Sequence, residues 1–175
     1  METIYKYNFV YLYMSRIKTI ILGDSSVGKS TLLTCIREEQ NIIPTIGVDC
    51  IVHNNLQIWD TSGHKRFKQV VEVFYGKMDM VVFVYRDMDS LAHVEDIRRC
   101  VQSQGRKPVK YILVYNGGDD KMRTQGEAYA TMYNFKFVSG DLIDIEESKS
   151  IMDIIEECGK KNSHDKNGWR YCWFY

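Results

Sequence analysis

A glycine-bounded loop between an apolar run and a helical run is the feature that most constrains this chain. The loop reads Gly23-Asp-Ser-Ser-Val-Gly28-Lys29-Ser30, follows the apolar run 17–22, and leads into Thr31-Leu-Leu-Thr-Cys-Ile36. The order of strand, loop and helix and the pattern G-x-x-x-x-G-K-[ST] are those of the phosphate-binding P-loop. Backbone N–H groups of such a loop form a concave anion site, and the following helix adds its positive N-terminal end. The alternative is a glycine turn that matches the pattern by chance.

Each residue type in this loop suits a bound polyphosphate. Gly28 lets the backbone approach a phosphate without a Cβ in the way. The Lys29 ammonium would bridge the β- and γ-phosphates, and the Ser30 hydroxyl would hold Mg²⁺. The segment expected to bind phosphate consists of Gly23, Asp24, Ser25, Ser26, Val27, Gly28, Lys29, Ser30 and Thr31.

Short apolar runs recur along the chain and predict an α/β fold with a mostly parallel central sheet flanked by helices. They are apolar on both faces, which is typical of buried parallel strands, and they cover 17–22, 56–59, 80–85, 111–115 and 135–138. The helices expected between them cover 30–39, 66–75, 90–104, 124–133 and 146–160. This alternation implies right-handed crossovers in a doubly wound sheet. Apolar side chains at helical spacing in 146–160 are expected to pack in the core.

Length and composition favour one domain with a proper core. The chain has 175 residues, of which 45% are apolar and 26% charged, as in an ordinary globular protein. Its formal net charge is zero, which gives no support for nucleic-acid binding. We expect an arm over 1–15 (loose, or an extra edge strand), one folded domain over 16–162, and a short tail over 163–175. Met14 offers an alternative start of translation.

The five scattered cysteines and the lack of a long apolar run give information about the cellular compartment of the chain. The cysteines show no paired or metal-like spacing, which favours reduced thiols in a cytoplasmic compartment over disulfides. No apolar run approaches the length of a membrane span. Cys172 is fourth from the end, the prenylation position, but bulky aromatics follow it. We expect a cytoplasmic protein, with peripheral membrane association through Cys172 as the alternative.

An acidic residue and a glycine follow the run 56–59, as Asp60-Thr-Ser-Gly63. They come at the carboxyl end of a buried strand, the edge of an α/β sheet where ligands bind. Asp60 would hold Mg²⁺ through water, and the Gly63 amide could donate to a terminal phosphate. The pattern D-x-x-G alone is common by chance, and its place after a P-loop and a buried strand makes it specific.

Asn116-Gly-Gly-Asp119 follows the run 111–115 and suits recognition of guanine. The Asp119 carboxylate can accept hydrogen bonds from N1–H and from the exocyclic amine of guanine, a donor pair that adenine lacks. A backbone N–H within Ser139-Gly140-Asp141 could donate to the base carbonyl. Asn-Gly and Gly-Asp also form turns, so a plain turn is the alternative for 116–119.

Together these residues resemble a small GTPase of the Ras superfamily, and within it the Rab branch. The similarity runs from about residue 16 to about residue 160, and beyond the motifs above it includes Thr45-Ile-Gly-Val-Asp49, Leu56-Gln-Ile-Trp-Asp-Thr61, Arg66-Phe-Lys68, Phe74-Tyr-Gly76 and Phe83-Val-Tyr85. The resemblance implies GTP or GDP with Mg²⁺ as cofactors and Ser30, Thr45 and Asp60 as metal residues. It implies GTP hydrolysis involving Lys29 and Gly63, and effector and regulatory proteins that bind switch I and switch II, about residues 40–75. The activity would serve regulation of the membrane-traffic type.

Departures from the family pattern concern the catalytic water, the base and switch I. His64 stands where the family has the glutamine that orients the attacking water, which predicts either slower hydrolysis or an exposed residue that has drifted without a role. Gly117 and Asp141 replace two lysines that cover the base. The segment from Ser30 to Thr45 is short and lacks the aromatic that packs on guanine, and 53–55 is expected to be the turn of a shortened hairpin. Each of these three changes removes a side chain that would pack on the base and costs about 1 kcal/mol of binding free energy. Together they predict that guanine binding is weakened by about a hundredfold.

Two other functions are alternatives. A GTP-binding module that has lost hydrolysis would sequester partner proteins. The changes at His64 and Gly117 favour it, whereas the intact Lys29–Ser30 pair and Asp60 favour retained chemistry. A P-loop small-molecule kinase would need an arginine-bearing lid and an acceptor site, and the sequence shows neither. A preference for ATP over GTP would favour the kinase.

Overall fold

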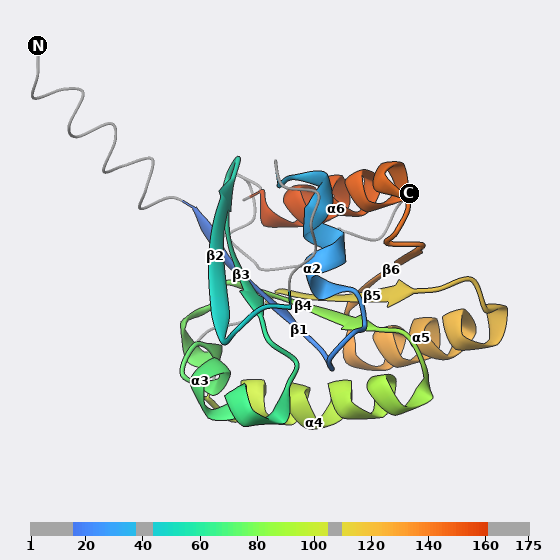
Figure 1. Cartoon of the computed structure of the whole chain (residues 1–175). Helices are drawn as coiled ribbons and strands as arrows, with labels where there is room; N and C mark the ends of the chain where they lie inside the picture. The colour runs from blue at the N-terminus through green and yellow to red at the C-terminus, as the bar shows by residue number, and fades with distance from the viewer. Residues whose placement is uncertain (1–15, 38–43, 105–109, 161–175) are drawn as a thin grey trace, which may run out of the picture.

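The computed structural model describes residues 16–37, 44–104 and 110–160. They form one six-stranded sheet with helices on both faces (Figure 1). The predicted arm over 1–15 and tail over 163–175, with Cys172, lie outside the described residues. The four cysteines that are described, at positions 35, 50, 100 and 158, are all free thiols.

The sheet has the strand order β2-β3-β1-β4-β5-β6. The strands are β1 (Ile17–Leu22), β2 (Val48–His53), β3 (Leu56–Thr61), β4 (Met80–Tyr85), β5 (Lys110–Asn116) and β6 (Lys136–Gly140). Only β2 runs antiparallel to its neighbour β3, and the other neighbouring pairs are parallel. All five predicted strands are present: 17–22 and 80–85 have the predicted bounds, and the ends of the other three differ by at most two residues. The predicted hairpin is β2–β3, and Asn54 in its turn has a φ of 49°.

The helical segments differ more from the prediction than the strands do. They are α2 (Lys29–Leu32), η1 (Leu33–Cys35), η2 (Lys65–Phe67), α3 (Lys68–Glu72), η3 (Tyr75–Lys77), α4 (Met88–Gln104), α5 (Asp120–Tyr133) and α6 (Ile145–Gly159), where η marks a 3-10 helix. The predictions for the last three were nearly correct. The helices predicted over 30–39 and 66–75 were correct only in part: each is present as short α-helical and 3-10 segments in place of one regular helix, and residues 38 and 39 lie outside the described residues. In the first, the Thr34 hydroxyl donates to the Thr31 carbonyl, a local bond that competes with regular helix.

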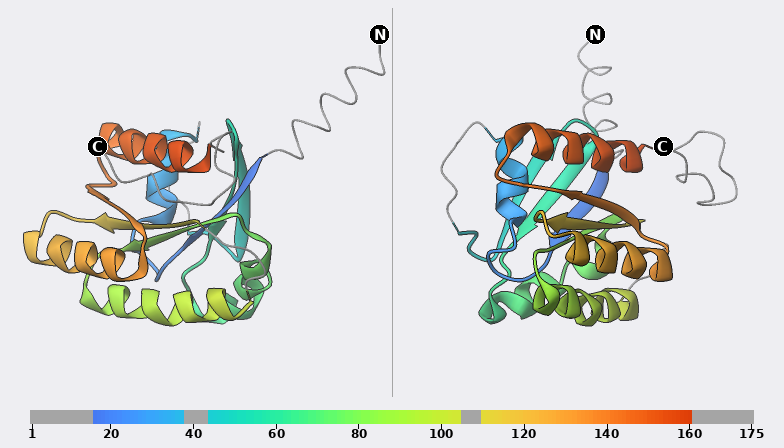
Figure 2. Two further views of the ribbon diagram at one scale, coloured as in Figure 1. Left: turned by 180° about the vertical axis from the view of Figure 1, so that it is seen from behind. Right: turned by 90° about the vertical axis from the view of Figure 1, so that its right-hand side faces the viewer.

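Each face of the sheet carries its own apolar core. α2 and α6 cover one face, and α3, α4 and α5 cover the other (Figures 1 and 2). Neighbouring residues of β1 point to opposite faces: Ile21 packs with Ile151 and Ile155 of α6, and Ile20 belongs to the cluster on the other face. The apolar side chains at helical spacing in 146–160 therefore pack in the core, as predicted.

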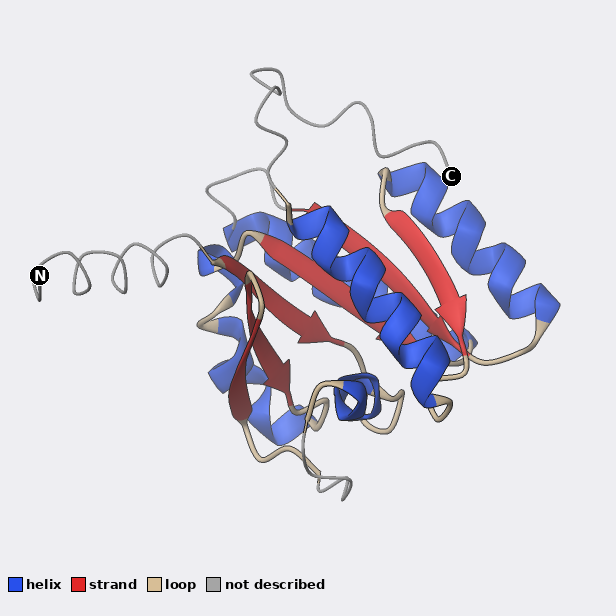
Figure 3. Cartoon of the chain, turned by 90° about the horizontal axis from the view of Figure 1, so that it is seen from above, coloured by secondary structure: helices blue, strands red, loops and turns tan. Residues whose placement is uncertain are grey.

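The topology brings several loops to one edge. The arrowheads of the parallel strands point toward the same edge of the molecule (Figure 3). β1 and β4 are neighbours, and from them the chain continues to opposite sides of the sheet. Such a switch point is where open α/β sheets bind ligands, because the loops after adjacent strands diverge there and leave a crevice. Within the described parts of the chain, no helix is long and apolar enough to cross a membrane.

Candidate functional site

The predicted phosphate loop connects β1 to α2 and closes tightly around the start of the helix. Gly28 has a φ of 104°, a left-handed conformation that favours glycine. A Cβ added there would lie 2.5 Å from Asn116 Nδ2, so the position also has no room for a side chain. All the predicted phosphate-binding residues, from Gly23 to Thr31, therefore lie in this one loop and the first turn of α2.

Lys29 is held inside the loop that it would serve. Its side chain is buried, and Nζ donates to the carbonyl of Gly23 at 3.0 Å and to that of Asp24. Burial lowers the pKa of Lys29 to about 8, while the carboxylates of Asp60 and Asp24 act in the opposite direction. A buried ammonium group gains from an anion beside it, which is what a phosphate would supply.

The three predicted metal residues converge on one point. Ser30 Oγ donates to Asp60 Oδ2 at 2.8 Å, Thr45 Oγ1 donates to the same oxygen at 2.9 Å, and the two hydroxyls are 3.0 Å apart. Asp60 is completely buried, and its Oδ1 atom has no hydrogen-bond partner among the described residues. A set of oxygen donors with one buried, unsatisfied carboxylate oxygen fits Mg²⁺, a hard cation that is bound through carboxylates, water and phosphate.

Arg37 also reaches this point, and sequence reasoning missed it. Its Nη2 atom lies 3.2 Å from Asp60 Oδ2 and 2.9 Å from Asp49 Oδ2. The only signal in the sequence was a cation in the short segment between Ser30 and Thr45, and that signal does not say where the side chain goes.

Gly63 and His64 follow β3 and lie against the phosphate loop. A Cβ on Gly63 would come within 2.3 Å of the Ser25 nitrogen, so only glycine allows this approach. His64 is exposed, and its Nδ1 accepts a hydrogen bond from the Arg66 amide at 3.2 Å. Gly63, His64 and Asp24 line a cavity of about 320 Å³. The structure thus brings His64 to the cavity beside the phosphate loop, but its ring is engaged locally.

At the other end of the site, Asn116 ties two loops together. Its Nδ2 donates to the Val27 carbonyl at 2.9 Å, and its Oδ1 accepts from the Leu142 amide at 3.1 Å. Asp119 is exposed, and its Oδ1 accepts from the Met122 amide at 2.8 Å, which caps the start of α5. The segment 116–119 is therefore the connection from β5 to α5, and reading of guanine by Asp119 stays a prediction.

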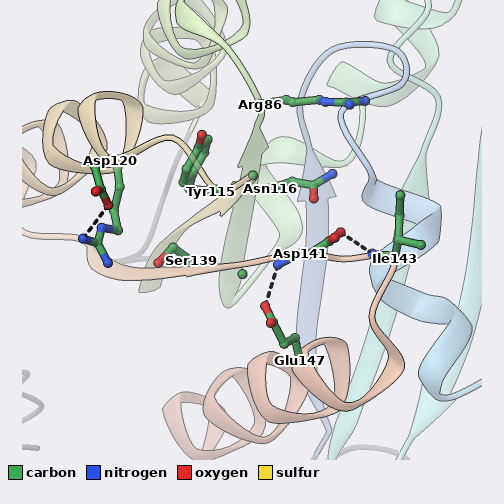
Figure 4. Close-up of a pocket in the computed structure, with 12 residues that line it drawn as sticks. Arg86, Tyr115, Asn116, Asp120, Ser139, Asp141, Ile143 and Glu147 are labelled. Atoms are coloured by element: carbon green, nitrogen blue, oxygen red, sulfur yellow. Dashed lines mark hydrogen bonds and ion pairs between the residues drawn. The ribbon is translucent and has the colours of Figure 1, made fainter.

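A cavity of about 370 Å³ lies where the base was predicted to bind (Figure 4). Of the residues predicted to contact the base, Asn116, Ser139 and Gly140 line it, and Asp119 is not among its lining residues. Glu147 of α6 lines it too, and its Oε2 accepts from the Asp141 amide at 2.6 Å. That amide is engaged within the protein, so the predicted donor to a base carbonyl is left to the neighbouring backbone at Gly140.

Tyr115 is a second residue of this cavity that the prediction missed. A Cβ on Gly117 would lie 2.7 Å from the Tyr115 hydroxyl, which also accepts from the Asp119 amide at 3.1 Å. The aromatic side chain therefore fills the space beside Gly117 and supports the loop that carries Asp119. An aromatic at the end of a predicted strand was the only sequence signal for this.

Comparison with known proteins agrees with this geometry. A sequence model of the Ras family matches residues 18–161. The Ras-related protein SEC4 of Candida albicans is 30% identical over 162 residues, which cover 80% of this chain and 77% of the relative. The GTP-binding protein yptV2 of Volvox carteri is 31% identical over 158 residues (78% and 73%), and the Ras-related protein RABE1e of Arabidopsis thaliana is 31% identical over 140 residues (69% and 64%).

Proposed function

The chain belongs to the Ras family and is a divergent Rab-like member of it, and we propose that it is a guanine-nucleotide switch. In this proposal it binds GTP and GDP with Mg²⁺, hydrolyses GTP slowly, and presents a different surface to partner proteins in each state. The proteins would bind the segment of about 40–75, and the process served would be of the membrane-traffic type. Cys172 is the candidate point for a lipid anchor.

The observation that carries the proposal is the convergence of Ser30, Thr45 and Asp60 beside the buried Lys29. A bound Mg²⁺ would supply positive charge to neutralise the phosphates. Asp60 would hold the metal through water, and the two hydroxyls would hold it directly. Lys29 would leave the carbonyl of Gly23 for phosphate oxygens. The Thr45 and Gly63 contacts would depend on the γ-phosphate, so its loss would release both segments.

The base preference tests the proposal directly. We expect the purified protein with Mg²⁺ to bind GTP and GDP more tightly than ATP in competition titrations, and mass analysis of what co-purifies to find a guanine nucleotide. Asp119→Ala should remove this preference, because adenine cannot use that carboxylate. Glu127→Ala is the matched control, because Glu127 is an exposed carboxylate further along α5 and is not among the residues that line the base cavity. Equal binding of GTP and ATP by the unaltered protein would refute the proposal.

The predicted slow hydrolysis is tested at His64. If the histidine positions water poorly, His64→Gln should raise the single-turnover rate of GTP hydrolysis by about tenfold or more, because orienting the attacking water lowers the barrier. The affinity for GDP should not change, because residue 64 would act beside the γ-phosphate, which GDP lacks. An unchanged rate would contradict the assignment and leave His64 as an exposed residue without a catalytic role.

One observation favours the alternative of a binding module without turnover. The acceptor nitrogen Nδ1 of His64 is already used by the Arg66 amide. Tight GTP binding with no measurable single-turnover hydrolysis, restored by His64→Gln, would support this alternative. The base loop gives a second reason to measure affinity, because the predicted weak guanine binding would itself limit the lifetime of either state.

A further inference from the structure

Arg37 gives the predicted Mg²⁺ site a cation of its own. One nitrogen, Nη2, contacts Asp60 Oδ2 at 3.2 Å and Asp49 Oδ2 at 2.9 Å. Asp60 is completely buried, and the Arg37 side chain is 27% exposed. Asp60 Oδ2 is also the oxygen that accepts from Ser30 and Thr45, so the guanidinium reaches the centre of the predicted metal site.

The two carboxylates that Arg37 joins lie directly opposite each other across two strands. Asp49 of β2 pairs with Asp60 of β3 in the antiparallel register. Like charges at opposed positions destabilise a sheet, and a buried carboxylate without a counter-charge costs several kcal/mol. Arg37 is therefore the counter-ion of both carboxylates. It compensates the buried charge of Asp60 and reduces the repulsion between Asp60 and Asp49 within the hairpin.

A metal ion bound at Asp60 would repel the guanidinium on the same carboxylate, so each weakens the contact of the other with Asp60. Two cations within a few ångströms of each other repel by several kcal/mol even when partly screened, and the repulsion is doubled for a divalent ion. Asp49 provides a second partner for the guanidinium: its side chain is 55% exposed, and it can keep Arg37 paired after Arg37 leaves Asp60.

We propose that Arg37 is an internal competitor of Mg²⁺: it occupies Asp60 when the metal is absent and moves to Asp49 alone when the metal binds. This inference rests on the proposed Mg²⁺ site and concerns how that site is regulated. Its consequence is a protein that is stable without metal, that needs more Mg²⁺ for saturation, and whose bound nucleotide depends less on the metal. If Arg37 were only a structural pair of the hairpin, its removal would not change the response to Mg²⁺.

Two variants are expected to change the metal response in opposite directions. The probe is MgCl₂ alone, added to the protein as purified after treatment with EDTA, and the measurement is the thermal unfolding midpoint. Arg37→Gln should unfold earlier than the unaltered protein in EDTA, and the Mg²⁺ concentration for half of the stabilisation should fall by about tenfold or more. Asp49→Asn should raise that concentration by several-fold, because Arg37 then has no second partner.

The double variant and a matched arginine control separate this from a general change of charge. In the Arg37→Gln background, Asp49→Asn should have little effect, since the two residues act through one contact. Arg99→Gln removes an exposed arginine on α4, far along the chain from the site, and should leave the Mg²⁺ half-point unchanged. Release of labelled GDP after addition of EDTA gives a second readout, and Arg37→Gln should show a larger acceleration than the unaltered protein.

The outcomes also distinguish this inference from the proposed function. The same Mg²⁺ half-point in Arg37→Gln and the unaltered protein overturns the inference, as does the absence of stabilisation by Mg²⁺ in every variant. Guanine preference with an unshifted half-point refutes the role of Arg37 and leaves the proposed function in place. A shifted half-point without guanine preference supports the role of Arg37 and refutes the switch.

Discussion

At the scale of single residues, Tyr115 and Gly117 act as a pair. Tyr115 is almost fully buried, its ring stacks on Tyr85 with centroids 5.0 Å apart, and its hydroxyl lies 2.7 Å from the place that a Cβ at residue 117 would take. A longer side chain at position 117, such as the lysine expected there from the family resemblance, therefore has no room beside Tyr115. Replacing glycine alone would not restore cover on the base, because the new side chain would first displace a packed aromatic.

Gly117→Ala should destabilise the protein by about 1–3 kcal/mol, the usual cost of overpacking a filled site. Gly118→Ala is the control, because a Cβ at Gly118 meets nothing within 4 Å and its φ is not positive. The control should be neutral or slightly stabilising, since alanine restricts the unfolded chain. Urea unfolding of both variants checks this, and equal costs at the two positions would contradict the role of Tyr115.

The sequence predicted which residues lie at the ends of the strands. It did not predict which groups the long side chains contact. Asp60 lies near the carboxyl end of β3, and Ser30 lies in α2 after the loop that follows β1. The carboxyl ends of these parallel strands meet at one edge, so the convergence of the two residues follows from the fold class. Arg37 and Glu147 reach the site from less defined positions: after a helix that ends early, and on the exposed side of α6. Long side chains have many rotamers, so their targets depend on tertiary register that local sequence does not encode.

At the scale of elements, α4 and α5 are joined by a polar cluster at the rim of an aromatic core. Glu95 of α4 accepts from Arg98 Nε at 2.7 Å and from the Tyr129 hydroxyl of α5 at 2.7 Å. Arg98 in turn lies 3.9 Å from the centre of the Tyr133 ring. These bonds from Arg98, with smaller help from Tyr129 and Arg99 and against the effect of burial, lower the pKa of Glu95 to about 2.

Glu95→Gln should lower stability by about 1–2 kcal/mol at neutral pH, because it removes charge-assisted bonds between two packed helices. The folded-state pKa lies below its ordinary value of 4.5, so the contribution is present above that value and is lost as pH falls through about 2. The difference between variant and unaltered protein in urea unfolding should therefore shrink in acid. Glu127→Gln, an exposed position on α5, is the control, and a difference that stays constant with pH would contradict the prediction.

Long amphipathic helices were predicted well, and short ones were not. α4 and α6 each repeat apolar residues over many turns, a pattern that tolerates local misfits. The segment 66–75 contains the β-branched residues Val70, Val71 and Val73, whose stiff side chains lower helix propensity. In a short segment this loss of helix propensity is not offset by packing over several turns. The chain therefore forms η2, α3 and η3 where the sequence predicted one helix.

At the scale of the whole molecule, the site is assembled from both halves of the sheet. The metal cluster comes from the α2, β2 and β3 side, and the base cavity comes from the β5 and β6 side. Asn116 is a direct link between the halves, because it bonds the phosphate loop at Val27 and the β6–α6 loop at Leu142. Any ligand that spans the two parts therefore depends on this side chain, whether or not it touches the ligand.

Asn116→Ala should cost about 1–3 kcal/mol, because it leaves the Val27 carbonyl and the Leu142 amide without their partner. The loss should be local to the site, since the sheet register does not depend on that side chain. Hydrogen exchange should therefore become faster in both 24–30 and 139–147, two segments far apart in sequence, while α4 serves as the internal control and stays unchanged. Faster exchange in only one of the two segments would mean that Asn116 does not couple them, and the base and phosphate parts would then be positioned independently.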